Sequence, residues 1–133
     1  MRRNLSSVAL ASIAAGPIFF VSAGLAAAQL ALPAPIALEP GEIHFLALAI
    51  VPAVLCGFVL SIIPNLIGSR FLRLAGEAFP AARARPAWIG SGLLFGGALA
   101  WLLGAFDSPA IAFGLVFTSA CCAAICRDSD GWD

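Results

Sequence analysis

The only histidine, His44, is the residue with the most evident capacity for chemistry. It lies close in sequence to Glu39 and Glu42, and together the three side chains offer nitrogen and oxygen ligands of the kind that divalent metals accept. Neither carboxylate stands at metal-ligand spacing from the histidine on a shared helical face. We therefore interpret His44 as a solvated, pH-sensitive side chain and predict no metal site, with metal binding or proton handling as the alternative.

Four cysteines form the second candidate group: Cys56, Cys121, Cys122 and Cys126. Cys122 and Cys126 share a helical face, and a soft ion such as Cu(I) accepts thiolate ligands. The single methionine is the first residue, so no thioether set accompanies them. We interpret the cysteines as small, polarizable packing residues. Thiol redox or metal-handling chemistry is the weaker alternative.

Other kinds of functional site lack their characteristic residues. The sole histidine has no serine partner in a recognisable nucleophile motif, and no glycine-rich phosphate loop joins a strand to a helix. No basic face of the type that contacts phosphates is present, which argues against nucleic-acid binding. One histidine also cannot supply both axial ligands of a haem. The sequence thus predicts no catalytic residues, no cofactor and no identifiable small-molecule ligand, and we expect a protein that is not an enzyme.

Composition indicates the environment in which the chain folds. Of its 133 residues, 62% are hydrophobic and only 11% are charged, and the mean hydropathy is +1.03. A soluble domain typically carries about 25% charged residues. The chain therefore cannot cover itself with polar side chains, and its main partner is predicted to be the lipid bilayer.

Four uncharged stretches divide the chain, at 4–38, 43–69, 86–106 and 108–126. A helix of about 20 residues spans the roughly 30 Å hydrocarbon core, and unpaired backbone amides are not tolerated in lipid. The sequence thus predicts an all-α integral membrane protein, a single transmembrane domain over 1–133 with four transmembrane helices in two antiparallel hairpins. The expected spans are 7–29, 44–67, 88–106 and 109–126.

The basic connector at 68–87 is expected to contain a short amphipathic segment. Arg70, Arg73 and Glu77 share one helical face, and Phe71 and Leu74 share another. Such a segment between the second and third spans is predicted to lie at the membrane interface, its arginines near anionic headgroups.

Two further features belong to the ends and bends of the predicted spans. Trp88, at the inner start of the third span, is expected to anchor the chain at the membrane interface. Pro64 removes a helical hydrogen bond in the second span, and Ser61 and Asn65 are expected to help satisfy the carbonyl groups near it.

The arginines predict the orientation. Basic residues concentrate in the cytoplasmic connections of membrane proteins, and an inside N-terminus brings every basic residue of this chain to that side. We therefore expect a multi-pass protein of the bacterial inner membrane with both termini in the cytoplasm. An alternative is that residues 1–28 are a cleaved signal peptide, which leaves three spans. The topology-setting residues are Arg2, Arg3, Arg70, Arg73, Arg83, Arg85 and Arg127.

Small residues recur every four positions along the last two spans. Close packing of small residues stabilises helix pairs in lipid, where hydrophobic contact contributes little. We expect the two faces to pack against each other as a tight hairpin, or against a second copy of the chain. The predicted helix-packing residues are Gly92, Gly96, Ala100 and Gly104 in the third span, and Gly114, Thr118 and Cys122 in the fourth.

The functional interpretation follows from the lack of catalytic residues and from the small-residue packing faces. No carboxylate or arginine lies within the four spans, whereas ion-coupled carriers usually keep one there. We predict a small, non-catalytic accessory, assembly or helix-packing subunit, acting as a homo-oligomer or within a larger membrane complex. An oligomeric transporter or channel component is the alternative.

Overall fold

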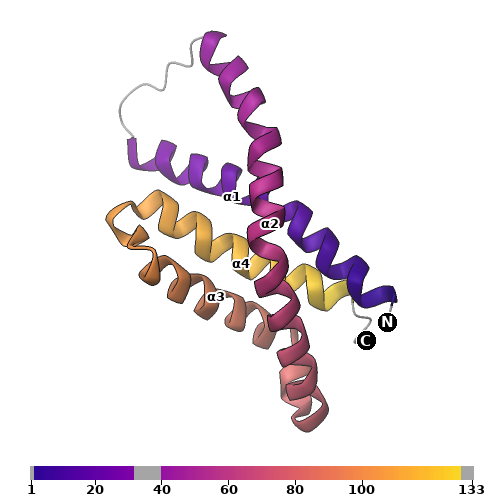
Figure 1. Cartoon of the computed structure of the whole chain (residues 1–133). Helices are drawn as coiled ribbons and strands as arrows, with labels where there is room; N and C mark the ends of the chain where they lie inside the picture. The colour runs from indigo at the N-terminus through magenta and orange to yellow at the C-terminus, as the bar shows by residue number, and fades with distance from the viewer. Residues whose placement is uncertain (1, 32–39, 130–133) are drawn as a thin grey trace.

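The computed structural model describes residues 2–31 and 40–129. These form four α-helices and two short 3-10 helices, with no strand among them (Figure 1). The all-α expectation is therefore confirmed for this part of the chain. The helices are α1 (Arg2–Ala31), α2 (Pro40–Ala78), α3 (Arg85–Leu102) and α4 (Pro109–Ser129), with η1 (Pro80–Arg83) between α2 and α3 and η2 (Ala105–Asp107) between α3 and α4.

Three of the four α-helices are long and apolar enough to cross a membrane, by length and composition. They are Val8–Ala31 in α1, Ala47–Ala78 in α2 and Pro109–Asp128 in α4. These helices make the chain a multi-pass membrane protein. The helix α3 is not among the three: it has 18 residues, a length of about 27 Å, and begins with Arg85 and Pro86.

Helix α1 lies at the centre of the packing. It contacts α2 on one face and α4 on another, while α3 packs mainly against α4. Figure 1 shows α1 and α4 running antiparallel, α3 alongside α4, and the long α2 crossing them. The pairs α1–α2 and α3–α4 are thus in contact, and the α1–α4 contact joins them.

The crossing of α1 and α2 brings two glycines into backbone contact. A Cβ atom built on Gly57 would lie 2.5 Å from the Cα of Gly16, and one built on Gly16 would overlap the carbonyl oxygen of Ala53. Only glycine, which has no Cβ, permits this approach. The position of α2 on α1 therefore depends on these two residues.

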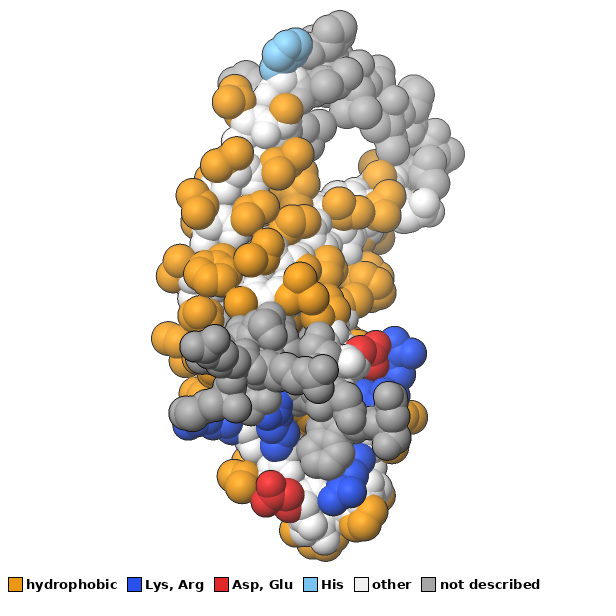
Figure 2. All heavy atoms as spheres, turned by 90° about the vertical axis from the view of Figure 1, so that its right-hand side faces the viewer, with side chains coloured by type: hydrophobic (Ala, Val, Ile, Leu, Met, Phe, Trp, Pro, Cys, Tyr) orange, Lys and Arg blue, Asp and Glu red, His pale blue; other side chains and the backbone are white. Residues whose placement is uncertain are grey.

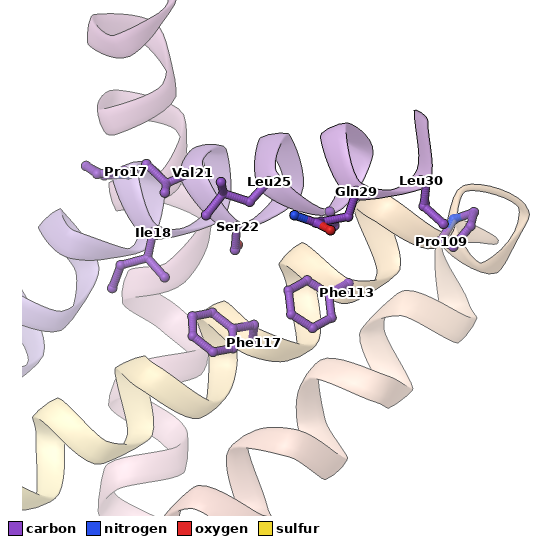
Figure 3. A pocket seen from close by; sticks show the side chains of 11 residues that line it. Pro17, Ile18, Val21, Ser22, Leu25, Gln29, Leu30, Pro109, Phe113 and Phe117 are labelled. Atoms are coloured by element: carbon purple, nitrogen blue, oxygen red, sulfur yellow. The ribbon is translucent and has the colours of Figure 1, made fainter. Parts of the chain in front are cut away.

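The buried core lies in one half of the bundle. It collects the N-terminal part of α1, the start of α3, the C-terminal part of α4 and partly buried residues from the second half of α2. The opposite half carries an apolar groove between α1 and α4 (Figure 3). The buried members of the core are Val8, Ala11, Ala15, Trp88, Cys122 and Cys126.

Charged side chains gather at one end of the molecule. Figure 2 shows the basic side chains that it colours, together with acidic ones, toward one end of the molecule and the histidine at the opposite end. The ion pair of Arg85 with Asp128 belongs to the first of these ends. Large apolar side chains cover the surface between them. This distribution is that of a protein whose middle lies in lipid.

The expected element boundaries were wrong in two places. The amphipathic segment after residue 67 is not a separate element, because α2 continues without interruption to Ala78. The third helix ends at Leu102 rather than at residue 106, because Gly104 adopts a left-handed conformation with φ of 63°. Such a residue commonly ends a helix. Pro109 then begins α4, where a missing amide hydrogen has no cost.

Candidate functional site

A cluster of uncharged polar side chains lies where α1, α2 and α4 meet. Ser12 of α1 is fully buried. Its hydroxyl oxygen accepts a hydrogen bond from the Asn65 side-chain amide at 3.3 Å, and its carbonyl oxygen accepts one from the Ser61 hydroxyl at 3.4 Å. Two side chains of α2 therefore bind one residue of α1.

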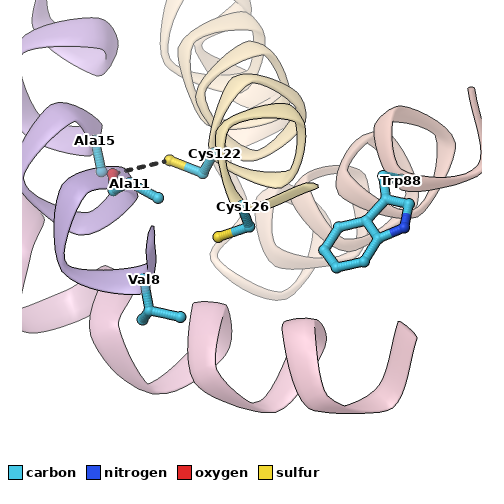
Figure 4. Packing of buried hydrophobic residues seen from close by; sticks show 6 residues of the cluster. All are labelled: Val8, Ala11, Ala15, Trp88, Cys122 and Cys126. Atoms are coloured by element: carbon cyan, nitrogen blue, oxygen red, sulfur yellow. Dashed lines mark hydrogen bonds between the residues drawn. The ribbon is translucent and has the colours of Figure 1, made fainter. Parts of the chain in front are cut away.

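Cys122 brings α4 into this cluster. Its thiol donates to the carbonyl oxygen of Ala11 at 3.4 Å, the contact drawn in Figure 4. Asn65 also lies within hydrogen-bonding reach of the Cys122 sulfur. Asn65 thus contacts Ser12 of α1 and Cys122 of α4 from its own place on α2. We refer to Ser12, Ser61, Asn65 and Cys122 as the polar cluster.

The spacing of small and polar residues along α2 explains why the cluster forms. Ala53, Gly57, Ser61 and Asn65 recur every fourth residue and so share one face of the helix. The first two allow the close approach to α1, and the last two hydrogen-bond across it. Pro64 also lies here and leaves the carbonyl oxygen four residues earlier without its helical partner.

The polar cluster holds helices together through hydrogen bonds between uncharged groups. It consists of two hydroxyls, a carboxamide and a thiol, with no carboxylate or imidazole among its members. Hydrogen bonds between membrane helices contribute about 0.6 kcal/mol on average and up to roughly 1.7 kcal/mol. The cluster therefore fixes the relative positions of three helices, and nothing in it favours acid–base or nucleophilic catalysis.

Two further buried polar atoms have no hydrogen-bond partner among the described residues: the hydroxyl of Thr118 and the indole nitrogen of Trp88. An unsatisfied buried group costs about 1–3 kcal/mol. Trp88 is only 1% exposed and belongs to the core (Figure 4). The expectation that it anchors the chain at the membrane interface was therefore wrong.

The interface between α3 and α4 is built on two of the predicted packing glycines. A Cβ on Gly92 would lie 2.8 Å from the Cα of Ala120, and one on Gly96 would lie 2.8 Å from the Cα of Val116. Both glycines are buried, as is Ala100, which lies one turn further along α3. The backbones of α3 and α4 therefore approach closely along this face.

The partner of the α4 small-residue face differs from the one expected. A Cβ built on Gly114 would lie 3.0 Å from side-chain atoms of Phe19 and Ala23 on α1, and Cys122 bonds to Ala11 of α1. Thr118 is buried on the same α4 face. The expected partner was α3, but α3 contacts the neighbouring face of α4, at Val116 and Ala120.

Gly104 lies outside both packing faces. A Cβ there would meet nothing within 4 Å, and the residue belongs to the turn after α3. Its function is conformational, because the left-handed backbone at this point favours glycine.

The arginine end joins the helix termini. The Arg85 guanidinium pairs with the Asp128 carboxylate at 2.9 Å, and Arg127 pairs with the same carboxylate at 3.3 Å. The Arg83 side chain donates to the carbonyl oxygen of Gly76 at 2.8 Å. These bonds connect the end of α2, the start of α3 and the end of α4. Exposed ion pairs contribute at most about 1 kcal/mol each.

The remaining arginines lie on the long helices. Arg70 and Arg73 are in the last third of α2, and Arg2 and Arg3 are in the first turn of α1. Because successive helices alternate in direction, the predicted topology-setting positions all lie toward the same end of the bundle (Figure 1).

His44 and the four cysteines, which were considered for metal binding, lie within the described residues. No group of three potential ligands forms among residues 2–31 and 40–129. His44 is exposed near the start of α2, Glu39 lies outside the described residues, and Cys56 is exposed on α2 away from the buried Cys122. The four cysteines all lie within the described ranges, and no disulfide joins any two of them.

Comparison with known proteins identifies no relative: no family model, curated protein or solved structure matches the chain. Its function must therefore be inferred from the residues and contacts described above.

The hydrogen bonds of the polar cluster between helices were not predicted from the sequence. Ser12, Gly16 and Gly57 were not expected to form contacts, although the four-residue spacing from Ala53 to Asn65 was a usable signal. Ser61 and Asn65 were expected only to satisfy carbonyl groups near Pro64. The stripe in α2 is the same kind of pattern as those found in α3 and α4.

A double-mutant cycle tests the link between α1 and α2. Ser12→Ala and Asn65→Ala should each destabilise the protein, and together they should cost less than the sum, with a coupling energy of about 0.6–1.7 kcal/mol. The measurement is unfolding in bicelles by a denaturing detergent. Ser91, whose hydroxyl bonds to the carbonyl of Trp88 in its own helix, provides the control. Ser91→Ala should be additive with Asn65→Ala, and additivity of Ser12 with Asn65 would contradict the assignment.

Proposed function

We propose that the chain is a small, non-catalytic accessory or assembly subunit of the bacterial inner membrane, acting through contacts between helices. The proposal includes four transmembrane helices, with α3 as the fourth. Support for α3 comes from its close packing on α4 through Gly92 and Gly96. Arg85 at one end of α3 and Asp107 beyond the other also bracket an uncharged stretch.

The observation that carries the proposal is the free surface of α2. No residue in its most apolar 18-residue stretch is buried (0%), although the helix has 39 residues and a length of about 58 Å. The face from Ala53 to Asn65 lies against α1. Further along α2, partly buried side chains such as Leu66 and Leu72 pack against the core. Leu48 and Leu60, for example, are 73% and 76% exposed. A long, apolar and uncharged face of this kind suits contact with a helix of another membrane protein.

The proposed orientation has the arginine end in the cytoplasm. The arginines of the α2 end, of η1, of the α3 start and of the α4 end give the blue side chains toward one end of Figure 2, and the histidine lies at the other end. Asp107 lies in η2, beyond the far end of α3. The positive-inside bias then assigns both termini to the cytoplasm.

An oligomeric transporter or channel component is the second candidate. Its support is the polar cluster, which lies among apolar helices where polar groups often mark a transport path. The membrane-spanning stretches contain no carboxylate or arginine that could couple transport to an ion. This candidate is therefore a passive pore or channel.

Purification of the tagged protein from native membranes, followed by mass spectrometry of intact complexes, tests the proposed function. We expect a stoichiometric partner subunit. Leu60→Trp on the free face of α2 should reduce the recovered partner several-fold. Leu94→Trp, at an equally exposed position on α3 (78%), should not. A complex containing only copies of this chain would contradict the accessory function and favour the transporter or channel.

The orientation is tested by thiol labelling in a variant whose native cysteines are replaced by alanine. A cysteine introduced by Asp107→Cys should react with a membrane-impermeant maleimide in intact spheroplasts. One introduced by Ala81→Cys, in η1, should react only after permeabilisation. The reverse pattern would place the arginine end outside, and labelling of both sites in intact cells would contradict α3 as a span.

A further inference from the structure

Charged side chains border the uncharged stretches of the chain in a strict order. At one end of every stretch the adjoining residue is an arginine: Arg3, Arg70, Arg85 or Arg127. At the other end it is an acid: Glu39, Glu42 or Asp107. Because successive helices alternate in direction, the four arginines belong to one end of the bundle, and Figure 2 shows basic side chains toward one end of the molecule.

This order gives the two ends opposite charge. The segments that adjoin the arginine ends of the stretches, 1–3, 70–85 and 127–133, contain seven arginines and four carboxylate side chains. The segments at the opposite ends, 39–42 and 107, contain three carboxylates and no arginine or lysine. Anionic lipids are attracted to basic side chains at the membrane surface within about one Debye length. The excess of arginine therefore favours anionic lipids in the leaflet at that end.

Two of the four arginines meet at one point of the described surface. Arg85 at the start of α3 and Arg127 at the end of α4 bind different oxygens of the Asp128 carboxylate, at 2.9 Å and 3.3 Å. The Nε atom of Arg127 also donates to the carbonyl oxygen of Arg83 at 3.3 Å. Two guanidinium groups from different helices are thus held around one carboxylate. We refer to Arg85 and Arg127 as the arginine pair.

The arginine pair lies at the depth of the lipid phosphates. The apolar span of α4 runs from Pro109 to Asp128, and its 20 residues have a length of about 30 Å, which is the thickness of the hydrocarbon core. Asp128 therefore lies where the hydrocarbon ends, and its ion pair brings Arg85 to the same level. The anionic groups found at this depth of a bilayer are phosphates. The depth thus favours a lipid headgroup over an acidic segment of a protein in the surrounding water.

The arginine pair is also accessible to such a group. The side chains of Arg85 and Asp128 are 59% and 45% exposed. A guanidinium group has five N–H donors, and within the described residues Arg85 gives one of them to Asp128. Guanidinium groups bind phosphate oxygens through paired N–H donors. Because the two arginines and Asp128 carry a net positive charge, a phosphodiester with its single negative charge balances them.

We propose that the arginine pair is a binding site for the phosphate of an anionic phospholipid. Arg85 is the main donor, and the negative charge of Asp128 limits the affinity. The inference rests on the insertion of the helices in a membrane. It does not depend on the accessory function or on which compartment the arginines face.

Native mass spectrometry of the full-length protein in detergent tests the proposal. The protein is mixed with equal amounts of phosphatidylglycerol and phosphatidylethanolamine that have identical acyl chains, and the bound lipids are counted. The unmodified protein should prefer phosphatidylglycerol. Arg85→Gln should lower this preference about fivefold, which corresponds to about 1 kcal/mol for one basic residue at the membrane surface. Arg70→Gln removes the same charge from an exposed position on α2 and should have a much smaller effect.

Two carboxylate variants distinguish a lipid site from an ion pair that only stabilises the α3–α4 contact. Asp128→Asn removes the negative charge beside the arginine pair and should increase the binding of phosphatidylglycerol. Asp107→Asn, in η2 beyond the far end of α3, changes the net charge equally and should leave binding as it was. If the ion pair were only structural, Asp128→Asn would reduce binding as Arg85→Gln does. The preference of the unmodified protein tests the site even if a variant fails to fold.

Three outcomes would overturn the proposal. Equal binding of the two lipids to the unmodified protein would mean that the arginines select no anionic headgroup. Equal losses in Arg70→Gln and Arg85→Gln would assign the preference to total charge instead of a site. Displacement of phosphatidylglycerol by an equal concentration of glycerol phosphate would identify a soluble phosphate as the ligand. None of these outcomes bears on the accessory function, which is tested by the co-purified subunit.

Discussion

The close approach of α1 and α2 at Gly16 and Gly57 is the constraint on which the other contacts depend. The two backbones touch there, and no side chain fits between them. This approach brings Ser61 and Asn65 of α2 within hydrogen-bonding distance of Ser12 on α1. Asn65 in turn reaches Cys122, so the position of α4 on α1 depends on the same crossing.

A division between small and large side chains runs through the fold. Glycine, alanine and serine lie at the α1–α2 and α3–α4 interfaces, while leucine, isoleucine and phenylalanine face outward along α2, α3 and α4. In water this arrangement would be unstable. In lipid the outer apolar side chains remain in an apolar environment, and close backbone packing stabilises the bundle. The tightly packed half holds the core, and the other half leaves the groove between α1 and α4.

The sequence predicted the properties that depend on one helix alone. It did not predict which faces of different helices pack together. Uncharged stretches and turn residues located all four helices, because the length of a span and the conformation of a proline or glycine are local properties. The glycines of α3 could be recognised as a packing face, but the partner of the Gly114 face could not, since spacing identifies a face and not its neighbour. Trp88 was assigned to the interface because it lies at the inner start of the third span, whereas tertiary packing buries it. The polar cluster joins residues more than 50 positions apart, which no local pattern reveals.

The central claim is tested most directly by comparing the unfolding free energies of Gly16→Ala and Gly24→Ala in bicelles. A Cβ at position 16 overlaps the backbone of α2, whereas one at position 24 meets nothing within 4 Å. Overpacking of this kind costs about 1–3 kcal/mol, and alanine in an open helical position is neutral or stabilises by roughly 0.5–1 kcal/mol. We therefore predict a marked loss of stability for Gly16→Ala and none for Gly24→Ala. Equal stability of the two variants would contradict the crossing of α1 and α2 described here.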